Sequence, residues 1–135
     1  MKKAALLIIA ALVLIPGCWP RRRVIAPEWR LTVLREGRPV ANALVTESWK
    51  DYSVAAGGQV RQYTDAAGRI VFPERVVYSS PIYRTLGCAM QVVMSGAHAS
   101  CGPSASTAAY WQNYEGWADY RPGGVLPRAI DLHER

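Results

Sequence analysis

Histidine, cysteine and acidic residues are all scarce in this chain of 135 residues, which has two histidines, three cysteines and ten Asp or Glu. A hydrolase of the Ser-His-Asp type needs an imidazole base, and His98 and His133 are the two candidates. The sequence contains neither a Gly-x-Ser-x-Gly elbow nor a His-Glu-x-x-His motif. We therefore expect no catalytic residues and no cofactor, although a pair of catalytic carboxylates stays open.

The sequence also lacks an apolar run long enough to cross a bilayer as a helix, which takes about 20 residues. The longest run, Ala4 to Ile15, has 12 residues and follows Lys2 and Lys3. A short apolar run behind a basic start is typical of a secretory signal peptide. The alternative is a short buried helix.

The run ends in Ile15-Pro16-Gly17-Cys18, which resembles the lipobox of bacterial lipoproteins. Pro16 stands where that motif usually has a small residue. The resemblance implies cleavage before Cys18 and acylation of its sulfur, with an ordinary cleaved signal and an uncleaved anchor as alternatives. Several acyl chains make such an anchor stable.

The same resemblance divides the chain and places it in the cell. Residues 1–17 would be the signal peptide, residues 18–28 an acylated tether, and residues 29–135 the folded domain. Trp19 follows the cysteine, where enterobacterial lipoproteins kept in the inner membrane carry Asp. We expect a lipid-anchored protein of the cell envelope, at the outer membrane and facing the periplasm.

Without Lys2 and Lys3 the chain keeps 14 basic and 10 acidic side chains, so its net charge is 14 − 10 = +4. The arginines are scattered and an exported protein does not meet nucleic acid, so we expect no nucleic-acid partner. The one basic cluster, Arg21-Arg22-Arg23, follows the anchor. It could rest on anionic head groups, at about 1 kcal/mol per charge, or belong to a solvated tether.

Period-two alternation indicates strands in the first half of the chain. Trp19 to Pro27 has no apolar period and is predicted to be a linker. Alternation from Trp29 to Val33 is typical of a half-buried strand. The further expectations, in chain order, are a turn over Arg35–Val40, a strand over Val40–Trp49, a loop over Asp51–Gly58, and strands over Gln59–Thr64 and Arg69–Phe72 around a tight turn.

Beyond Pro73 the pattern predicts more strands and no helix. Strands are expected over Val76–Tyr78, Leu86–Met94 and Ala129–Leu132, and a long surface loop over Ser95–Ala109. Pro81 would confine pairing near it to a sheet edge. Many short strands between Gly and Pro turns favour an all-β sandwich or barrel.

Two stretches resemble carboxypeptidase regulatory-like domains: "GRPVANALV" (Gly37 to Val45) and "TDAAGRIVF" (Thr64 to Phe72). Their order and separation also agree with that family. The resemblance implies a transthyretin-like antiparallel sandwich, similar to an immunoglobulin fold, and covers about a third of the chain. The segment from Pro73 onward departs from the family pattern.

The matching residues imply structural roles. Pro39 and Val40 would shape the first hairpin, Ala43 and Val45 would point into the sandwich, and Gly68 would make the second turn. No catalytic group is implied by the resemblance.

Asp65 and Gly68 stand three apart, as in many calcium loops, but calcium needs several oxygen ligands in alternation. Two alanines separate them and Arg69-Ile70-Val71-Phe72 follows. We predict instead that Asp65 accepts backbone hydrogen bonds, that Gly68 takes a positive φ, and that no metal binds.

Cys88 and Cys101 remain as a pair once Cys18 is acylated, and an oxidising compartment favours a disulfide between them. Its loop of about 14 residues would stabilise the fold by roughly 3 kcal/mol in the chain-entropy model. Two free thiols, or a metal site with His98, are the alternatives.

The segment "YWQNYEGWADY" is rich in aromatic residues, which suit a sugar-stacking or protein-docking surface. Trp111 and Trp117 are the best anchors; the alternative is that the rings pack across the sandwich. The candidate surface residues are Tyr110, Trp111, Tyr114, Trp117 and Tyr120.

These observations predict a non-catalytic envelope module that binds or scaffolds an envelope protein or glycan. A structural or assembly subunit of a secretion or surface complex is the alternative, and an enzyme is a third. The sequence does not name the partner.

Overall fold

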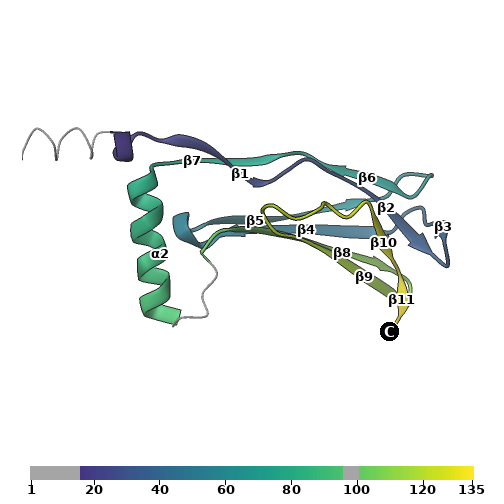
Figure 1. Ribbon diagram of the computed structural model, residues 1–135. Helices are drawn as coiled ribbons and strands as arrows, with labels where there is room; N and C mark the ends of the chain where they lie inside the picture. The colour runs from purple at the N-terminus through teal and green to yellow at the C-terminus, as the bar shows by residue number, and fades with distance from the viewer. Residues whose placement is uncertain (1–15, 96–100) are drawn as a thin grey trace, which may run out of the picture.

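Two layers of mainly antiparallel strands face each other across the core, and one helix lies across an end of the sandwich (Figure 1). The computed structural model describes residues 16–95 and 101–135. The fold confirms the predicted all-β sandwich. Residues 1–15 of the predicted signal peptide lie outside the described chain.

The lower layer in Figure 1 is a five-stranded sheet in the order β11-β9-β8-β4-β5. Every pair in it is antiparallel. In chain order its strands are β4 (Leu44–Asp51), β5 (Ala56–Tyr63), β8 (Pro103–Trp111), β9 (Tyr114–Tyr120) and β11 (His133–Glu134). A short 3-10 helix, η1 (Tyr52–Val54), connects β4 to β5.

The upper layer consists of a four-stranded sheet and a two-stranded ribbon. The sheet contains β2 (Trp29–Arg35), β3 (Arg38–Pro39), β6 (Arg69–Phe72) and β10 (Ala129–Asp131), and the ribbon pairs β1 (Arg21–Ala26) with β7 (Arg75–Ser79). β10 runs parallel to β2, so this layer is not wholly antiparallel.

The ribbon continues the β2–β6 pair along the length of the sandwich. Ala26 lies opposite Arg75 and Trp29 lies opposite Phe72, so both pairs share one register. Pro27 and Pro73 interrupt the ladder between them, because proline has no N–H to donate. The linker predicted over Trp19 to Pro27 is therefore wrong where the chain forms β1. The folded unit begins before residue 29.

The apolar core lies under the β2–β6 half of the sandwich. Trp29, Val33 and Phe72 are fully buried, and Leu31 and Ile70 nearly so. The alternation predicted for Trp29 to Val33 thus gives an inward face as expected. Small residues of the facing strands complete the core, namely Ala43, Ala105, Ala109 and Ala118.

The segment Leu86 to Met94, predicted as a strand, is the middle of helix α2 (Pro81–Ser95), so both that strand and the expected absence of a helix are wrong. Ser80 precedes the helix and its Oγ accepts a hydrogen bond from the N–H of Tyr83 at 3.2 Å. Ser at the cap and Pro at the first helical position are typical helix starts. Leu, Ala, Met, Gln and Arg then favour helix over strand.

The long loop predicted over Ser95 to Ala109 is also wrong in part, because Pro103–Trp111 forms β8 between β4 and β9. Ala105, Thr107 and Ala109 alternate on its buried face. Small residues suit this central strand since the large Trp29 and Phe72 already fill the space between the layers. Residues 96–100 of that prediction lie outside the described chain.

The remaining strand predictions need smaller changes. β6 and β7 cover the strands expected over Arg69–Phe72 and Val76–Tyr78. β5 and β10 match those expected over Gln59–Thr64 and Ala129–Leu132 but end one residue earlier, at Tyr63 and Asp131. The strand expected over Val40–Trp49 starts only at Leu44, after a turn in which Asn42 has φ +56°. β5 already begins at Ala56, inside the loop expected over Asp51–Gly58.

Candidate binding face on the five-stranded sheet

The aromatic segment forms the β8–β9 hairpin, and strand alternation divides its rings between the two faces of the sheet. Tyr110 and Trp117 point outward, with 38% and 69% of their surface exposed. Trp111, Tyr114 and Tyr120 are half-buried and pack against the core. The prediction of one five-residue surface therefore fails for the latter three.

The three inward rings have structural partners. The Arg35 guanidinium lies 4.1 Å from the Tyr114 ring centroid and 5.5 Å from that of Trp111. Tyr120 packs edge-on against Trp29 with 6.4 Å between centroids. Such cation–π and edge-to-face contacts stabilise the packing of the two layers.

A residue that the sequence did not single out joins the outward rings. Tyr63 of β5 lies opposite Leu44 of β4, and Leu44 lies opposite Tyr110 of β8, so the three form one row across the sheet. Tyr63 is 67% exposed. Trp117 lies in the next row, opposite Ala108. We call Tyr63, Tyr110 and Trp117 the aromatic face.

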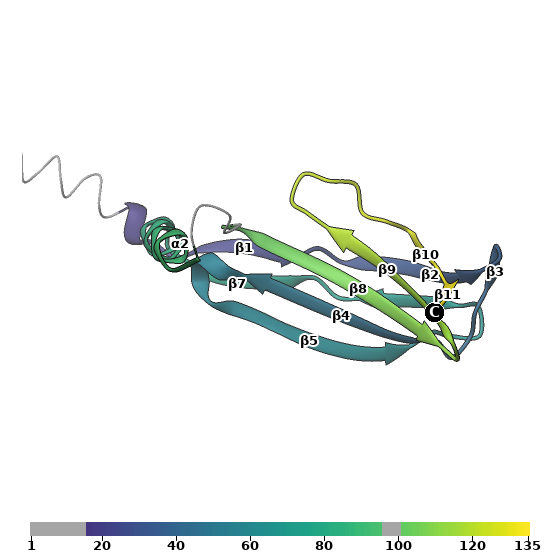
Figure 2. The ribbon, with the colours of Figure 1, turned by 90° about the horizontal axis from the view of Figure 1, so that it is seen from below.

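Leu44 lies between Tyr63 and Tyr110, and smaller side chains of β4 and β8 occupy the rows beyond. Thr46 lies opposite Ala108 in the row of Trp117, and Ser48 lies opposite Ser106 in the row beyond. Along β4, β8 and β9, no helix or strand of the described residues covers this side of the sheet (Figure 2). A flat sheet with exposed rings and hydroxyl groups can stack on a planar apolar or sugar surface and hydrogen-bond to it.

A charged rim borders the aromatic face at β11. The Arg135 guanidinium lies 5.2 Å from the Tyr110 ring centroid and pairs with Glu115 at 3.1 Å. His133, the candidate base, lies opposite Glu115 at the same exposed edge. An apolar centre with a polar rim is the usual anatomy of a binding surface.

A separate open cleft of about 1060 Å³ lies at the other end of the sheet, beside β1. Its lining includes Trp49, Tyr52 and Tyr120, together with Arg23 and other polar residues of β4, β8 and β9. Arg23 is already paired within the protein, as described next, so this cleft offers a weaker case for ligand binding than the aromatic face.

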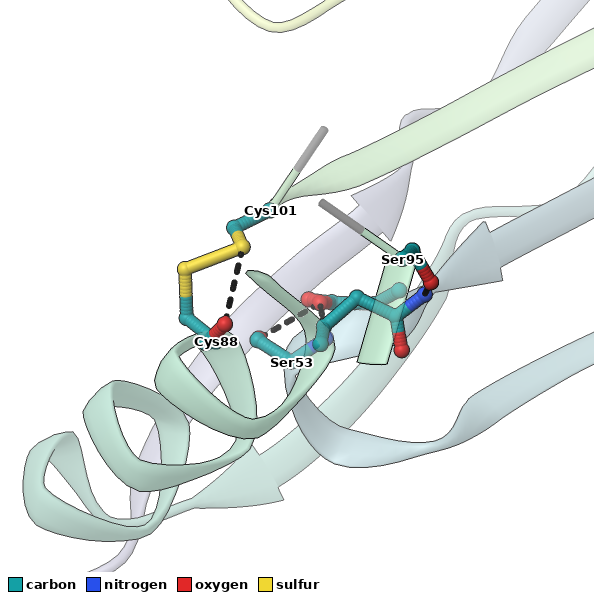
Figure 3. The surroundings of a disulfide bond; sticks show 6 residues. Ser53, Cys88, Ser95 and Cys101 are labelled. Carbon is teal, nitrogen blue, oxygen red and sulfur yellow. Dashed lines mark hydrogen bonds between the residues drawn. A yellow bond between two sulfur atoms is a disulfide. The ribbon is translucent and has the colours of Figure 1, made fainter. Parts of the chain in front are cut away.

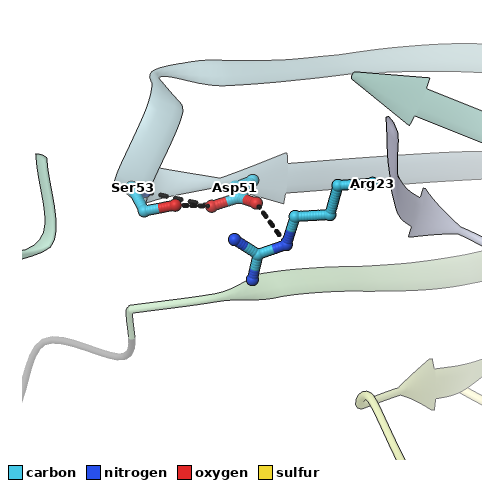
Figure 4. Close-up of polar contacts among 3 residues, drawn as sticks. All are labelled: Arg23, Asp51 and Ser53. Carbon is cyan, nitrogen blue, oxygen red and sulfur yellow. Dashed lines mark hydrogen bonds and ion pairs between the residues drawn. The ribbon is translucent and has the colours of Figure 1, made fainter. Parts of the chain in front are cut away.

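Two carboxylates that sequence reasoning missed are buried between the ribbon and the five-stranded sheet. Glu47 and Asp51 alternate on the inner face of β4, and both side chains are fully buried. Arg75 of β7 pairs with Glu47 at 3.2 Å. Arg23 of β1 pairs with Asp51 at 3.4 Å, as Figure 4 shows. The alternation Val45, Glu47, Trp49, Asp51 was the available signal.

Each carboxylate has one oxygen that accepts hydrogen bonds and one, Asp51 Oδ2 or Glu47 Oε1, that accepts none from the described residues. Asp51 Oδ1 accepts hydrogen bonds from the N–H and the hydroxyl of Ser53, at 3.1 and 2.6 Å. Glu47 Oε1 accepts none from the described residues. Burial raises the pKa of Glu47 above its ordinary value of 4.5, and the hydrogen bond and charge of Arg75 oppose that rise.

Cys88 and Cys101 form the predicted disulfide, which ties α2 to the start of β8 (Figure 3). The bond consumes both sulfurs, so the alternative metal site with His98 loses two of its ligands; His98 itself lies outside the described residues. In residues 16–95 and 101–135, no cluster of three His, Cys, Asp or Glu side chains is placed to hold a metal.

The stretch Thr64 to Phe72 forms a corner between the two layers. Asp65 Oδ1 accepts hydrogen bonds from the N–H groups of Ala67 and Arg69, both at 2.8 Å, and Gly68 has φ +70°. Both turn roles match the prediction. β5 and β6 do not pair with each other, however. The chain passes from one layer to the other at this turn, and the two strands do not form the expected hairpin.

Cys18, the predicted acylation position, is exposed and is the last residue of a helical turn at residues 16–18. Within the described chain, no helix has the length and hydropathy needed to span a bilayer.

Comparison with known proteins assigns no family. No family model matches the sequence, and no curated protein matches it. Among solved structures, the chain is similar to 3-chlorocatechol 1,2-dioxygenase from Rhodococcus opacus 1CP, with 12% sequence identity and a TM-score of 0.47. The match covers 80% of this chain and 59% of the dioxygenase chain, and no argument about activity rests on it.

Proposed function

We propose that this chain is a lipid-anchored protein of the bacterial cell envelope that binds another envelope component through the aromatic face, without catalysis. The observation that carries the proposal is the exposure of Tyr63, Tyr110 and Trp117 on one flat face of the five-stranded sheet. Large rings exposed together suit recognition, because tyrosine and tryptophan supply much contact area for little conformational entropy.

The resemblance to carboxypeptidase regulatory-like domains supports a scaffold role. Pro39 and Gly68 lie against each other at the corner of the sandwich, where a Cβ on Gly68 would come within 3.0 Å of the Pro39 Cβ. Val45 is fully buried, as that family pattern implies. These residues shape the fold and leave recognition to the exposed face.

The chemistry of the face favours a glycan as the partner. Ser48 and Ser106 lie in the row of the sheet next to that of Trp117, and stacking of an aromatic ring on a sugar ring with hydrogen-bonding groups nearby is a common mode of sugar recognition. The charged rim at Arg135 and Glu115 favours the second candidate, a protein partner in an assembled surface complex.

Retention of the detergent-solubilised, full-length protein on isolated peptidoglycan tests the proposal. We expect the wild type to be retained and Tyr63→Ala and Trp117→Ala to lose retention, each by about tenfold or more in affinity, since truncating a hot-spot aromatic residue costs about 2 kcal/mol or more. Tyr78→Ala is the matched control, because Tyr78 is equally exposed but lies on the ribbon.

The result also separates the two candidate partners. Capture of a stoichiometric envelope protein through Tyr63 and Trp117, without peptidoglycan retention, would make the chain an assembly subunit. Equal retention and equal protein capture by all three variants and the wild type would exclude the aromatic face as the binding site.

A further inference from the structure

Helix α2 lies across the end of the sandwich opposite the C-terminus, roughly at right angles to the strands (Figures 1 and 2). It packs on η1 at Gly87, where a Cβ would overlap the carbonyl oxygen of Ser53. The disulfide from Cys88 to Cys101 holds the same helical turn. The orientation of α2 on the sandwich is therefore set by backbone contact and a covalent bond.

The amphipathic pattern of α2 is reversed relative to a helix packed on a core. Its half-buried side toward the sandwich carries Arg84, Gly87, Cys88 and Gln91, and none of the residues of α2 is buried. Apolar side chains point to solvent instead. They form an apolar stripe at helical spacing, made of Tyr83, Leu86, Met90, Val93 and Met94.

The exposure of the stripe is large. Leu86 and Met90 are each 62% exposed, and Val93 and Met94 are each 78% exposed. A continuous apolar stripe of this kind on a folded protein marks a contact with an apolar phase or partner.

The position proposed for acylation lies at the same end of the molecule. In the uncleaved chain a Cβ on Gly17 would lie 2.8 Å from Cδ1 of Ile82, so the position directly before Cys18 lies at the first turn of α2. Figure 1 shows the turn that contains Cys18 beside the start of α2. Acyl chains on Cys18 would place α2 against the lipid to which they belong.

The charge of this end also suits an anionic lipid surface. α2 contains no Asp or Glu and one Arg. The exposed Arg21 and the half-exposed Arg22 follow the anchor on β1. Of these, Arg22 pairs with Glu74, so Arg21 is the side chain that can add an electrostatic contact with anionic head groups.

We propose that α2 is an interfacial membrane helix: its apolar stripe lies in the acyl boundary of the bilayer that holds the acylated Cys18. This inference rests on the proposed anchor. A helix with one apolar face binds in the plane of the interface, in proportion to the apolar area that it buries. Two attachments at one end hold the sandwich upright, with the aromatic face on its side, toward the end that is remote from the lipid surface.

The two methionines of the stripe provide the test, because Met90 and Met94 are the only methionines after Met1. Purified acylated protein is incorporated into vesicles of phosphatidylethanolamine and phosphatidylglycerol and oxidised with peroxide and hydroxyl radicals. Mass spectrometry then reads both methionines, Trp117 as an exposed internal reference, and the acyl mass on the Cys18 peptide. We expect both methionines to be oxidised severalfold more slowly than in a variant whose apolar stripe is disrupted, and Trp117 to be oxidised at the same rate in both.

Variants in the same vesicles give the comparison. Leu86→Glu combined with Val93→Glu should lose the protection, while Val125→Glu, at a residue that is 92% exposed outside α2, should keep it. The intact disulfide peptide reports that each variant is folded. These substitutions lie on an exposed surface, so we expect no loss of folding.

Each other outcome decides against the inference or the anchor. An acylated Cys18 with freely oxidised methionines would overturn the membrane helix and leave the anchor standing. Protection in native envelope membranes but not in pure lipid vesicles would assign the stripe to a protein partner. A Cys18 peptide without acyl mass would overturn the anchor itself.

Discussion

At the scale of single residues, backbone geometry at the corner between the layers is the most constrained feature. Thr64 Oγ1 donates to the carbonyl of Val40 at 2.8 Å and accepts from the N–H of Ala43 at 2.9 Å. Gly68 donates its N–H to the carbonyl of Asp65 at 3.0 Å. These bonds satisfy the polar groups of the corner without any ligand.

Two glycines separate two contributions to the unfolding free energy: steric crowding at this corner, and the strain of a positive φ in a residue with a side chain. Gly68 at φ +70° and Gly37 at φ +75° share a backbone conformation, but a Cβ on Gly37 meets nothing within 4 Å. A Cβ on Gly68 would come within 2.8 Å of Val40 N and 3.1 Å of Val33 O. We expect Gly37→Val to lower the free energy of unfolding by about 1–3 kcal/mol and Gly68→Val to lower it further.

Urea unfolding of both variants measures this difference. Equal losses at the two positions would show that the corner is not crowded. The midpoint of the wild type should not move with EDTA, since the carboxylate of Asp65 is used by backbone N–H groups; a shift would favour the calcium loop.

At the scale of elements, two buried ion pairs connect the ribbon to the five-stranded sheet, beside the buried apolar residues Ile25 and Ala26. The Arg75 guanidinium pairs with Glu47 and also lies 4.4 Å from the Trp49 ring centroid. Buried pairs of this kind contribute uncertain net stability but are costly to break singly. The packing of β7 on β4 is thus sensitive to the protonation of Glu47.

The pH dependence of stability should carry the sign of the raised Glu47 pKa. From pH 4.5 up to the raised pKa, the folded chain binds more protons at Glu47 than the unfolded chain, so this group lowers stability as pH rises. Glu47→Gln removes that loss, which amounts to at most about 1.4 kcal/mol per pH unit. The unfolding free energy of the variant minus that of the wild type should therefore increase with pH in this window.

Urea titrations of both proteins at several pH values between roughly 4 and 8 measure this difference in unfolding free energy. Glu134→Gln gives the baseline for loss of an exposed carboxylate. A difference between Glu47→Gln and wild type that falls with pH would mean that Arg75 outweighs burial.

At the scale of the whole molecule, the two ends of the sandwich have different proposed tasks. One end carries Cys18, α2 and the disulfide, and the C-terminus lies at the other end (Figure 1). The aromatic face lies on the outer side of the five-stranded sheet between them. An anchor at one end leaves this side open to a partner in the periplasm.

Replacement of the proposed anchor tests this arrangement. Cys18→Ala should release the protein from the membrane fraction or block its processing, because the acyl chains supply most of the membrane affinity. Cell fractionation with mass analysis of the N-terminal peptide is the measurement. A wild type without a lipid mass, together with a variant that still fractionates with membranes, would contradict lipid anchoring.

Local patterns in the sequence determined part of the fold. Trp29, Leu31 and Val33 are buried as their alternation predicts, and Asp65 and Gly68 make the turn expected of them. The disulfide between Cys88 and Cys101 followed from cysteine number and compartment. Each of these rests on neighbours in the chain or on simple counting, which is why the sequence could predict it.

The tertiary structure alone decided the rest. Strand alternation separates Tyr110 from Trp111, but only the position of the opposite layer determines which of them faces solvent. The same holds for Tyr63, which joins the aromatic face only through the register of β4 and β5. The apolar alternation of Leu86 to Met94 fits a strand as well as a helix, and the cap at Ser80 with the packing at Gly87 makes it α2. Contacts between residues far apart in sequence therefore placed both proposed contact surfaces.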